Sequence, residues 1–197
     1  MKFIFRNIHQ VVIRAIAYLQ KKLNPKQFLI VASILVGISS GFAAVILKSL
    51  AHYINVFIQE YSSNYQDFFL FTLFPLVGIT LTIVYLRLFV WRDFFRGSAD
   101  IVYAIAKKSS IIPQSHMYSH VISSGLTVGF GGSTGLESPL VNAGSAIGSN
   151  FGKTYHLSYK DRTMLLACGA AAAIAGAFNS PIAGVLFAIE VLLTDAT

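Results

Sequence analysis

Charged side chains are scarce in this sequence. Asp, Glu, Lys and Arg together make up 12% of its 197 residues, whereas hydrophobic residues make up 55%. A soluble globular domain carries about 25% charged residues. The composition therefore argues against an ordinary soluble domain and favours a protein that sits in a membrane.

Cysteine is nearly absent as well. Cys168 is the only cysteine, so no disulfide can form within the chain. It lies among glycines and alanines at 167–173, where we interpret it as a small packing residue. We expect neither a metal nor an organic cofactor.

Long uncharged runs occupy much of the chain. Those at 27–47, 68–86 and 163–189 are each about long enough to cross a hydrocarbon core of roughly 30 Å as a helix. Two shorter runs, 121–136 and 138–152, are rich in Gly and Ser, which predicts broken or re-entrant helices. The expected fold is an all-α, polytopic membrane protein.

The basic residues flank the apolar runs and do not form one basic face. The net charge is +7, and the bases lie before the first run, after the second and at 153–162, whereas the loop between has Lys48 against Glu60 and Asp67. This placement argues against a nucleic-acid partner. By the positive-inside rule the N-terminus is cytoplasmic, as in a bacterial inner-membrane protein, and 109–152 enters the lipid bilayer and returns to the same side.

Residues 1–26 have apolar positions at helical spacing among basic ones. This pattern predicts an amphipathic helix on the cytoplasmic membrane surface, and a solvated helix packed on the protein is the alternative. The absence of a small-residue cleavage site argues against a signal peptide. Residues 27–197 then form the transmembrane domain.

The segment at 125–139, GLTVGFGGSTGLESP, holds Glu137, the only acidic residue between Asp100 and Asp161. A carboxylate inside a bilayer costs several kcal/mol unless it is neutralised, paired or open to water. An isolated acid of this kind therefore indicates a functional site. The alternative is an exposed loop between two short helices.

Glycines crowd the stretch before this glutamate: Gly129, Gly131, Gly132 and Gly135. Pro139 suits the first turn of a new helix. The free N–H groups of Leu136, Glu137 and Ser138 then lie at the positive end of that helix, where backbone alone can hold an anion. We predict an anion site at Gly135, Leu136, Glu137 and Ser138. Its carboxylate takes the anion's position when ionised and leaves when protonated, so it acts as a gate, a proton carrier or both.

Two enzyme motifs match the same segment. Gly131, Ser133 and Gly135 fit the G-x-S-x-G nucleophile elbow, but the elbow needs a preceding strand and downstream Asp and His, and the only later histidine is His156 in a charged loop. A phosphate-binding loop would end in Lys and Ser or Thr. We therefore expect no enzyme.

The motif GSTGLESP at 132–139 resembles the gate motif G-x-E-x-P of the CLC family of chloride channels and chloride/proton exchangers. The run GAAAAIAGAFNSPIAGVLFAIE at 169–190 is similar to a second signature of that family. The resemblance is good over 87–197, whereas the first two runs agree only in hydropathy and order. It implies chloride as the transported ligand, Glu137 as the gate, and a homodimer with one anion pathway per subunit.

A complete CLC membrane domain contains two inverted halves and is roughly twice as long as this chain. The resemblance implies that the chain is the first inverted repeat and that a missing second half supplies further anion ligands, including a tyrosine. Either the sequence is truncated or a second chain supplies that half. A non-conducting subunit or fragment is the alternative.

The gate motif and an upstream motif depart from the family pattern. Leu136 and Ser138 replace the usual basic residue and glycine around the glutamate. The upstream motif G-S-G-I-P supplies a serine to the central anion site, and direct matching assigns that role to Ser98. Counting back without gaps from Glu137 puts Arg96 there instead.

Exchangers of the family carry an internal glutamate one residue past the position matched by Glu190. Here that residue is Val191, and family channels commonly have valine there. The resemblance therefore favours passive conduction, with the proton-relay position lost. Glu190 is then structural, or a substitute proton donor if the protein is an exchanger.

The run at 163–189 contains Pro181, which favours two helices over one kinked helix. His116, Tyr118 and His120 precede the re-entrant region. They either tune gating by pH or anchor a helix end at the membrane interface.

Overall fold

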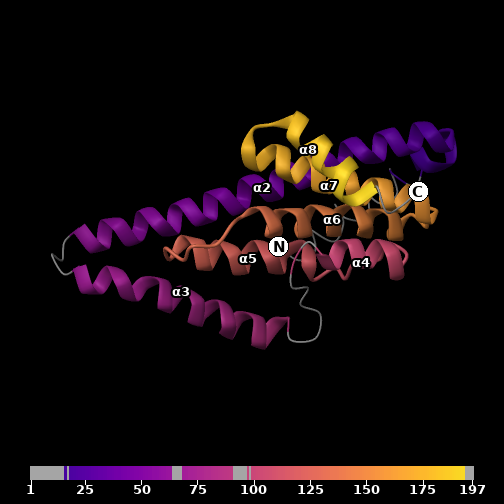
Figure 1. Ribbon diagram of the computed structural model, residues 1–197. Helices are drawn as coiled ribbons and strands as arrows, with labels where there is room; N and C mark the ends of the chain where they lie inside the picture. The colour runs from indigo at the N-terminus through magenta and orange to yellow at the C-terminus, as the bar shows by residue number, and fades with distance from the viewer. Residues whose placement is uncertain (1–15, 17, 64–67, 91–96, 98, 194–197) are drawn as a thin grey trace.

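The computed structural model describes residues 16, 18–63, 68–90, 97 and 99–193. All regular elements within these residues are helical and none is a strand, which confirms the all-α prediction. The elements are α2 (Pro25–Ser63), α3 (Phe68–Phe89), α4 (Ala99–Lys107), α5 (His116–Gly129), α6 (Glu137–Thr154), α7 (Tyr159–Phe178), α8 (Pro181–Phe187) and the π-helical turn η1 (Ala188–Leu193) (Figure 1).

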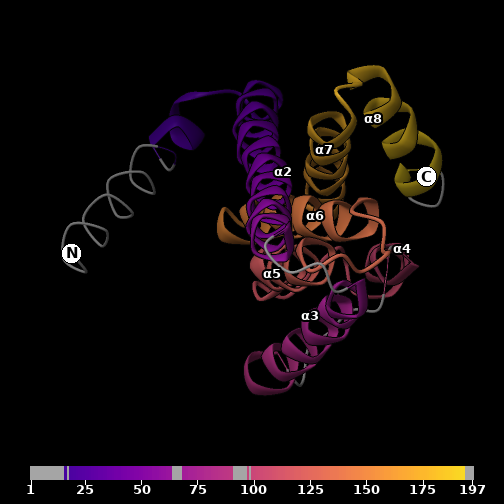
Figure 2. The same cartoon turned by 90° about the vertical axis from the view of Figure 1, so that its left-hand side faces the viewer.

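The helices pack in layers around α6. Figures 1 and 2 show α7 and α8 on one side of α6, and α5 with α4 on the other. α2 packs against α5, α6 and α7, and α3 lies outermost beside α5. The helix that begins at Glu137 is therefore the central helix of the described bundle.

α2 is longer than the predicted span at 27–47. Its 39 residues correspond to about 58 Å at 1.5 Å per residue. Phe42 and Phe57 are 64% and 70% exposed, which suits a surface in contact with lipid. Two described helical segments, Pro25–Glu60 and Tyr159–Phe178, are long and apolar enough to cross a membrane, and Leu73–Phe89 is a shorter apolar helix.

The predicted span at 163–189 does not form a single helix. α7 ends at Phe178, Asn179 adopts a left-handed conformation with φ of 54°, and Pro181 opens α8. Ser180, before the proline, is out of the helical region with φ of −129° and ψ of 87°. The alternative of one kinked helix is wrong, and the predicted division at Pro181 is confirmed.

α6 and α7 approach so closely that only glycine fits at their contact. A Cβ on Gly144 would collide with the carbonyl oxygen of Gly169, and one on Gly148 with the carbonyl oxygen of Leu165. Helix association in lipid relies on such close van der Waals packing. The glycines thus bring the central helix against α7 along most of its length.

A buried polar network holds the connection between α4 and α5 against α6. Ser149 Oγ donates to the carbonyl oxygen of Ser110 over 2.6 Å and accepts from the N–H of Ile112 over 2.9 Å. Asn150 Nδ2 donates to the carbonyl oxygen of Ile112 over 3.1 Å. These bonds satisfy backbone groups that lack a helical partner and tie the segment before α5 to α6.

The two ends of the 109–152 segment lie together. Arg162, next to the end of α6, donates to the carbonyl oxygen of Ser109 over 3.0 Å. Gln20, which precedes α2, donates to the carbonyl oxygen of Tyr155 over 3.0 Å, so the start of α2 lies at this end too. The charge pattern predicts the same arrangement, with these segments on one side of the membrane.

The predicted amphipathic helix at 1–26 falls mostly on residues 1–15 and 17, which lie outside the described residues. Described residues 18–22 are helical and precede α2.

Candidate anion site

The loop before α6 depends on glycine. α5 ends at Gly129, and Gly131 has φ of +86°, which glycine adopts without strain. The N–H of Gly132 donates to the carbonyl oxygen of Thr127 over 2.9 Å. The chain thereby turns back from α5 toward the start of α6.

Glu137 is the first residue of α6, directly after the loop from α5, and its side chain is exposed. No side chain caps this helix end at Leu136. The N–H groups of Glu137 and Ser138 are therefore not used by a capping side chain, and they lie at the positive end of the helix dipole. The end of α6 has the chemistry of an anion site, with a carboxylate at its first residue.

A polar pocket of about 340 Å³ lies on one side of Glu137. It is lined by Gly97, His120, Ser123, Ser124, Thr134, Gly135, Glu137, Ser138, Pro139 and Asn142. Hydroxyl, amide and imidazole groups dominate this lining, and no Lys or Arg is among its described residues. A hydrated anion could occupy such a pocket without a fixed cation.

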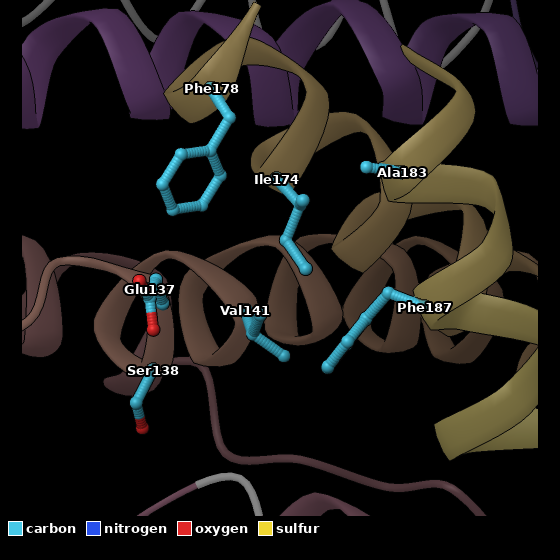
Figure 3. A pocket seen from close by; sticks show the side chains of 7 residues that line it. All are labelled: Glu137, Ser138, Val141, Ile174, Phe178, Ala183 and Phe187. Atoms are coloured by element: carbon cyan, nitrogen blue, oxygen red, sulfur yellow. The ribbon is translucent and has the colours of Figure 1, made fainter. Parts of the chain in front are cut away.

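A second pocket, of about 370 Å³, is mostly apolar and also includes Glu137 (Figure 3). Its walls come from α6, α7 and α8, and the lining residues are Glu137, Ser138, Val141, Ile174, Phe178, Ala183 and Phe187. Glu137 and Ser138 line both pockets. The carboxylate therefore lies at the border between a polar and an apolar space.

The structure brings Gly135, Glu137 and Ser138 together in the polar pocket. Leu136 differs, because its side chain packs against a buried apolar cluster that includes Leu140, and only its backbone belongs to the helix end. The predictions for Ser98 and Arg96 lie outside the described residues. Gly97, between them, lines the polar pocket.

Val191 and Glu190 lie in η1 and are both exposed. Neither lines the two pockets at Glu137. A π-helical turn is rare and often marks a functional position. The predicted loss of the proton relay at Val191 stays a prediction.

The sequence reasoning missed several polar residues of the site. Ser123, Thr134 and Asn142 were not predicted, although all three line the polar pocket. Asn142 Nδ2 donates to the carbonyl oxygen of Ser138 over 2.9 Å. Its position one helical turn after Ser138 is the signal that could have identified it.

The nucleophile elbow does not form at Ser133. The described element before Ser133 is helix α5, whereas the elbow places its serine between a strand and a helix.

A bundle of apolar helices with an acid at the first residue of its central helix is typical of membrane proteins that move ions. Residues 83–197 match the family described as voltage gated chloride channel. The chain belongs to this family, which confirms the resemblance inferred from its motifs. Members of the family are membrane proteins, and so is this chain.

Three relatives illustrate the range of the family. The chain is 30% identical to chloride channel protein CLC-d of Arabidopsis thaliana over 187 residues, which cover 80% of this chain and 23% of the relative. It is 28% identical to the chloride/fluoride channel protein of Pseudomonas syringae pv. tomato over 120 residues, which cover 61% of this chain and 26% of the relative. It is 44% identical to the H(+)/Cl(-) exchange transporter ClcA of Cronobacter sakazakii over 70 residues, which cover 35% of this chain and 15% of the relative. The chain thus spans about a quarter or less of these relatives.

Proposed function

We propose that this chain forms the first half of a pathway for selective, passive transport of chloride or a similar anion, with Glu137 as its gate. The position of Glu137 supports this most directly. It is the first residue of an uncapped helix and lies at the border of two pockets. In this proposal the anion and the Glu137 carboxylate that blocks it bind at the same helix end.

The proposed gate works by competition between two negative charges. When ionised, the Glu137 carboxylate takes the place of an anion at the N–H groups of Glu137 and Ser138. Protonation removes its charge, and the neutral side chain no longer competes with an anion. The hydroxyl and amide groups of Ser123, Thr134 and Asn142 then replace part of the anion's water shell.

The relatives include channels and an exchanger. Val191 stands where the resemblance places the internal glutamate of exchangers, and this favours passive conduction over proton-coupled exchange. Under the exchanger alternative, Glu190 in the adjacent position of η1 carries the proton.

We propose that the pathway is completed by a second half of the transport domain and that two such subunits form a homodimer. The protein then lies in a bacterial inner membrane with its N-terminus in the cytoplasm. A non-conducting subunit that only docks to a partner is the competing proposal.

Anion efflux from liposomes tests this function. The gene product that contains this chain is reconstituted, chloride efflux is started with a potassium ionophore, and external pH is recorded at the same time. We expect chloride to leave without proton movement. Stoichiometric proton uptake would establish the exchanger, and no efflux would support the non-conducting subunit.

Two variants test whether the gating role belongs to Glu137 and not to acidic residues in general. Glu137→Ala should leave chloride efflux intact or faster and remove its dependence on pH. Glu60→Gln is the matched control, because it neutralises an exposed acid of α2 that lines neither pocket. Loss of efflux in Glu137→Ala with unchanged folding would contradict the gate assignment.

A further inference from the structure

Two histidines form a buried pair at the start of α5. Nδ1 of His116 and Nε2 of His120 are 3.1 Å apart, and their ring centroids are 5.2 Å apart. His116 is fully buried and His120 is 5% exposed. One of these two nitrogens must donate and the other accept, so a neutral pair shares one N–H along this line. One added proton makes the pair a single buried cation.

The pair reaches the anion site directly. His120 lines the polar pocket together with Glu137 and Asn142. The hydroxyls of Ser115 and Ser119, which directly precede His116 and His120, are buried and have no hydrogen-bond partner among the described residues. Because His120 lines the pocket, it is the member of the pair through which a proton can pass to or from the pocket.

The charges around the pair come from two helices. Asp100 of α4 interacts electrostatically with His120, and Glu137 of α6 shares its pocket. α2 faces α5 with the apolar side chains Leu47, Leu50 and Ile54. α3 faces it with Thr82, bonded to Thr127, and with Tyr85 near Tyr118. Two carboxylates, on α4 and α6, are thus the charged groups that the described surroundings bring to this pair.

We propose that the His116–His120 pair is a second proton-binding site, distinct from Glu137, whose protonation is coupled to anion binding in the polar pocket. A buried imidazolium is costly without a counter-charge, and an anion in the pocket adds a negative charge to that of Asp100. The proton comes from water and returns to it, and only an N–H bond forms or breaks. This inference rests on the proposed function, because it requires an anion beside Glu137.

Because of thermodynamic linkage, the coupling can be measured either as a change of anion affinity with pH or as proton uptake on anion binding. If protonation of the pair strengthens anion binding, anion binding must draw protons onto the pair by the same factor. We expect chloride affinity to be about tenfold higher at about pH 4 than at about pH 8, within the usual range of coupling between two sites. Glu137 also takes part in proton binding, so the pair is measured with that acid removed.

The experiment uses the gene product that contains this chain, purified in detergent and carrying Glu137→Gln. Sodium chloride is added in weakly buffered solution at a series of pH values from about 4 to about 7, because burial favours the neutral imidazole, and proton uptake is followed with a pH-sensitive dye. Chloride affinity is measured by calorimetry at both pH extremes. We expect proton uptake and the tenfold change in affinity to persist in Glu137→Gln and to disappear in Glu137→Gln/His120→Gln.

Glu137→Gln/His52→Gln is the matched control, because His52 is exposed on α2 and should change neither readout. A second measurement needs no histidine variant: nitrogen-15 NMR of the Glu137→Gln protein should show chloride-dependent signals from His116 and His120 and none from His52 or His156. Proton uptake that is already lost in Glu137→Gln, or that survives in the His120 double variant, overturns the proposal. Absence of chloride binding at every pH instead refutes the proposed function, and the calorimetry reports that separately.

Discussion

The side-chain ammonium of Lys48 donates a 2.8 Å hydrogen bond to the carbonyl oxygen of Ala177. Lys48 belongs to α2 and Ala177 to the last turn of α7, so a cation from one helix caps the negative end of another. The next residue, Phe178, lines the apolar pocket at Glu137. The bond therefore supports the helix break that forms one wall of that pocket.

Replacing Lys48 should destabilise the end of α7 at this helix break. Lys48→Met removes the donor and should lower stability by about 1 kcal/mol, the usual contribution of one hydrogen bond. Lys48→Arg keeps a donor and a positive charge and should stay close to the parent protein. Thermal unfolding of the purified protein in detergent measures both, and equal midpoints for the two variants would contradict the capping role.

Gly144 should not tolerate a methyl group. A Cβ at this position would collide with the carbonyl oxygen of Gly169, so Gly144→Ala should separate α6 from α7 and cost about 3 kcal/mol. Gly41→Ala is the matched control, because a Cβ on Gly41 meets nothing within 4 Å. That variant should be neutral or slightly stabilising. The monodisperse fraction after purification and the unfolding temperature report the difference.

Ser149 should matter more than Ser145, although both side chains are buried in α6. Ser149→Ala leaves the buried N–H of Ile112 without its side-chain acceptor and should cost about 2 kcal/mol. The hydroxyl of Ser145 has no hydrogen-bond partner among the described residues, so Ser145→Ala should have little effect. Chemical unfolding monitored by tryptophan fluorescence compares the two, and equal losses would argue against the network.

The orientation in the membrane can be tested by chemical labelling. In a Cys168→Ser background, Gln59→Cys places a thiol on the exposed face near the end of α2, and Lys160→Cys places one on the exposed face at the start of α7. With the N-terminus in the cytoplasm, an impermeant maleimide added to intact cells should label only Gln59→Cys. Lys160→Cys should react once the membrane is opened, and the reverse pattern would refute the proposed orientation.

Local chemistry made parts of the site predictable. Pro139 and the glycines before it limit where a helix can start, so the position of Glu137 at the first turn of α6 followed from neighbouring residues. The break at Pro181 followed in the same way. α5 begins at His116, before the uncharged run at 121–136, and so includes His120. The structure accommodates that histidine by burial against His116.

The sequence by itself determined the membrane setting, the all-α fold, the family and the acidic residue at a helix start, because composition, hydropathy and local backbone preferences act over a few turns. Only the tertiary structure decided which distant groups meet. Ser149 bonds to Ser110, and Lys48 bonds to Ala177, far along the chain. The polar pocket likewise joins His120 of α5 to Glu137 of α6. These contacts depend on how closely whole helices pack, and no local sequence pattern encodes the distance between two helices.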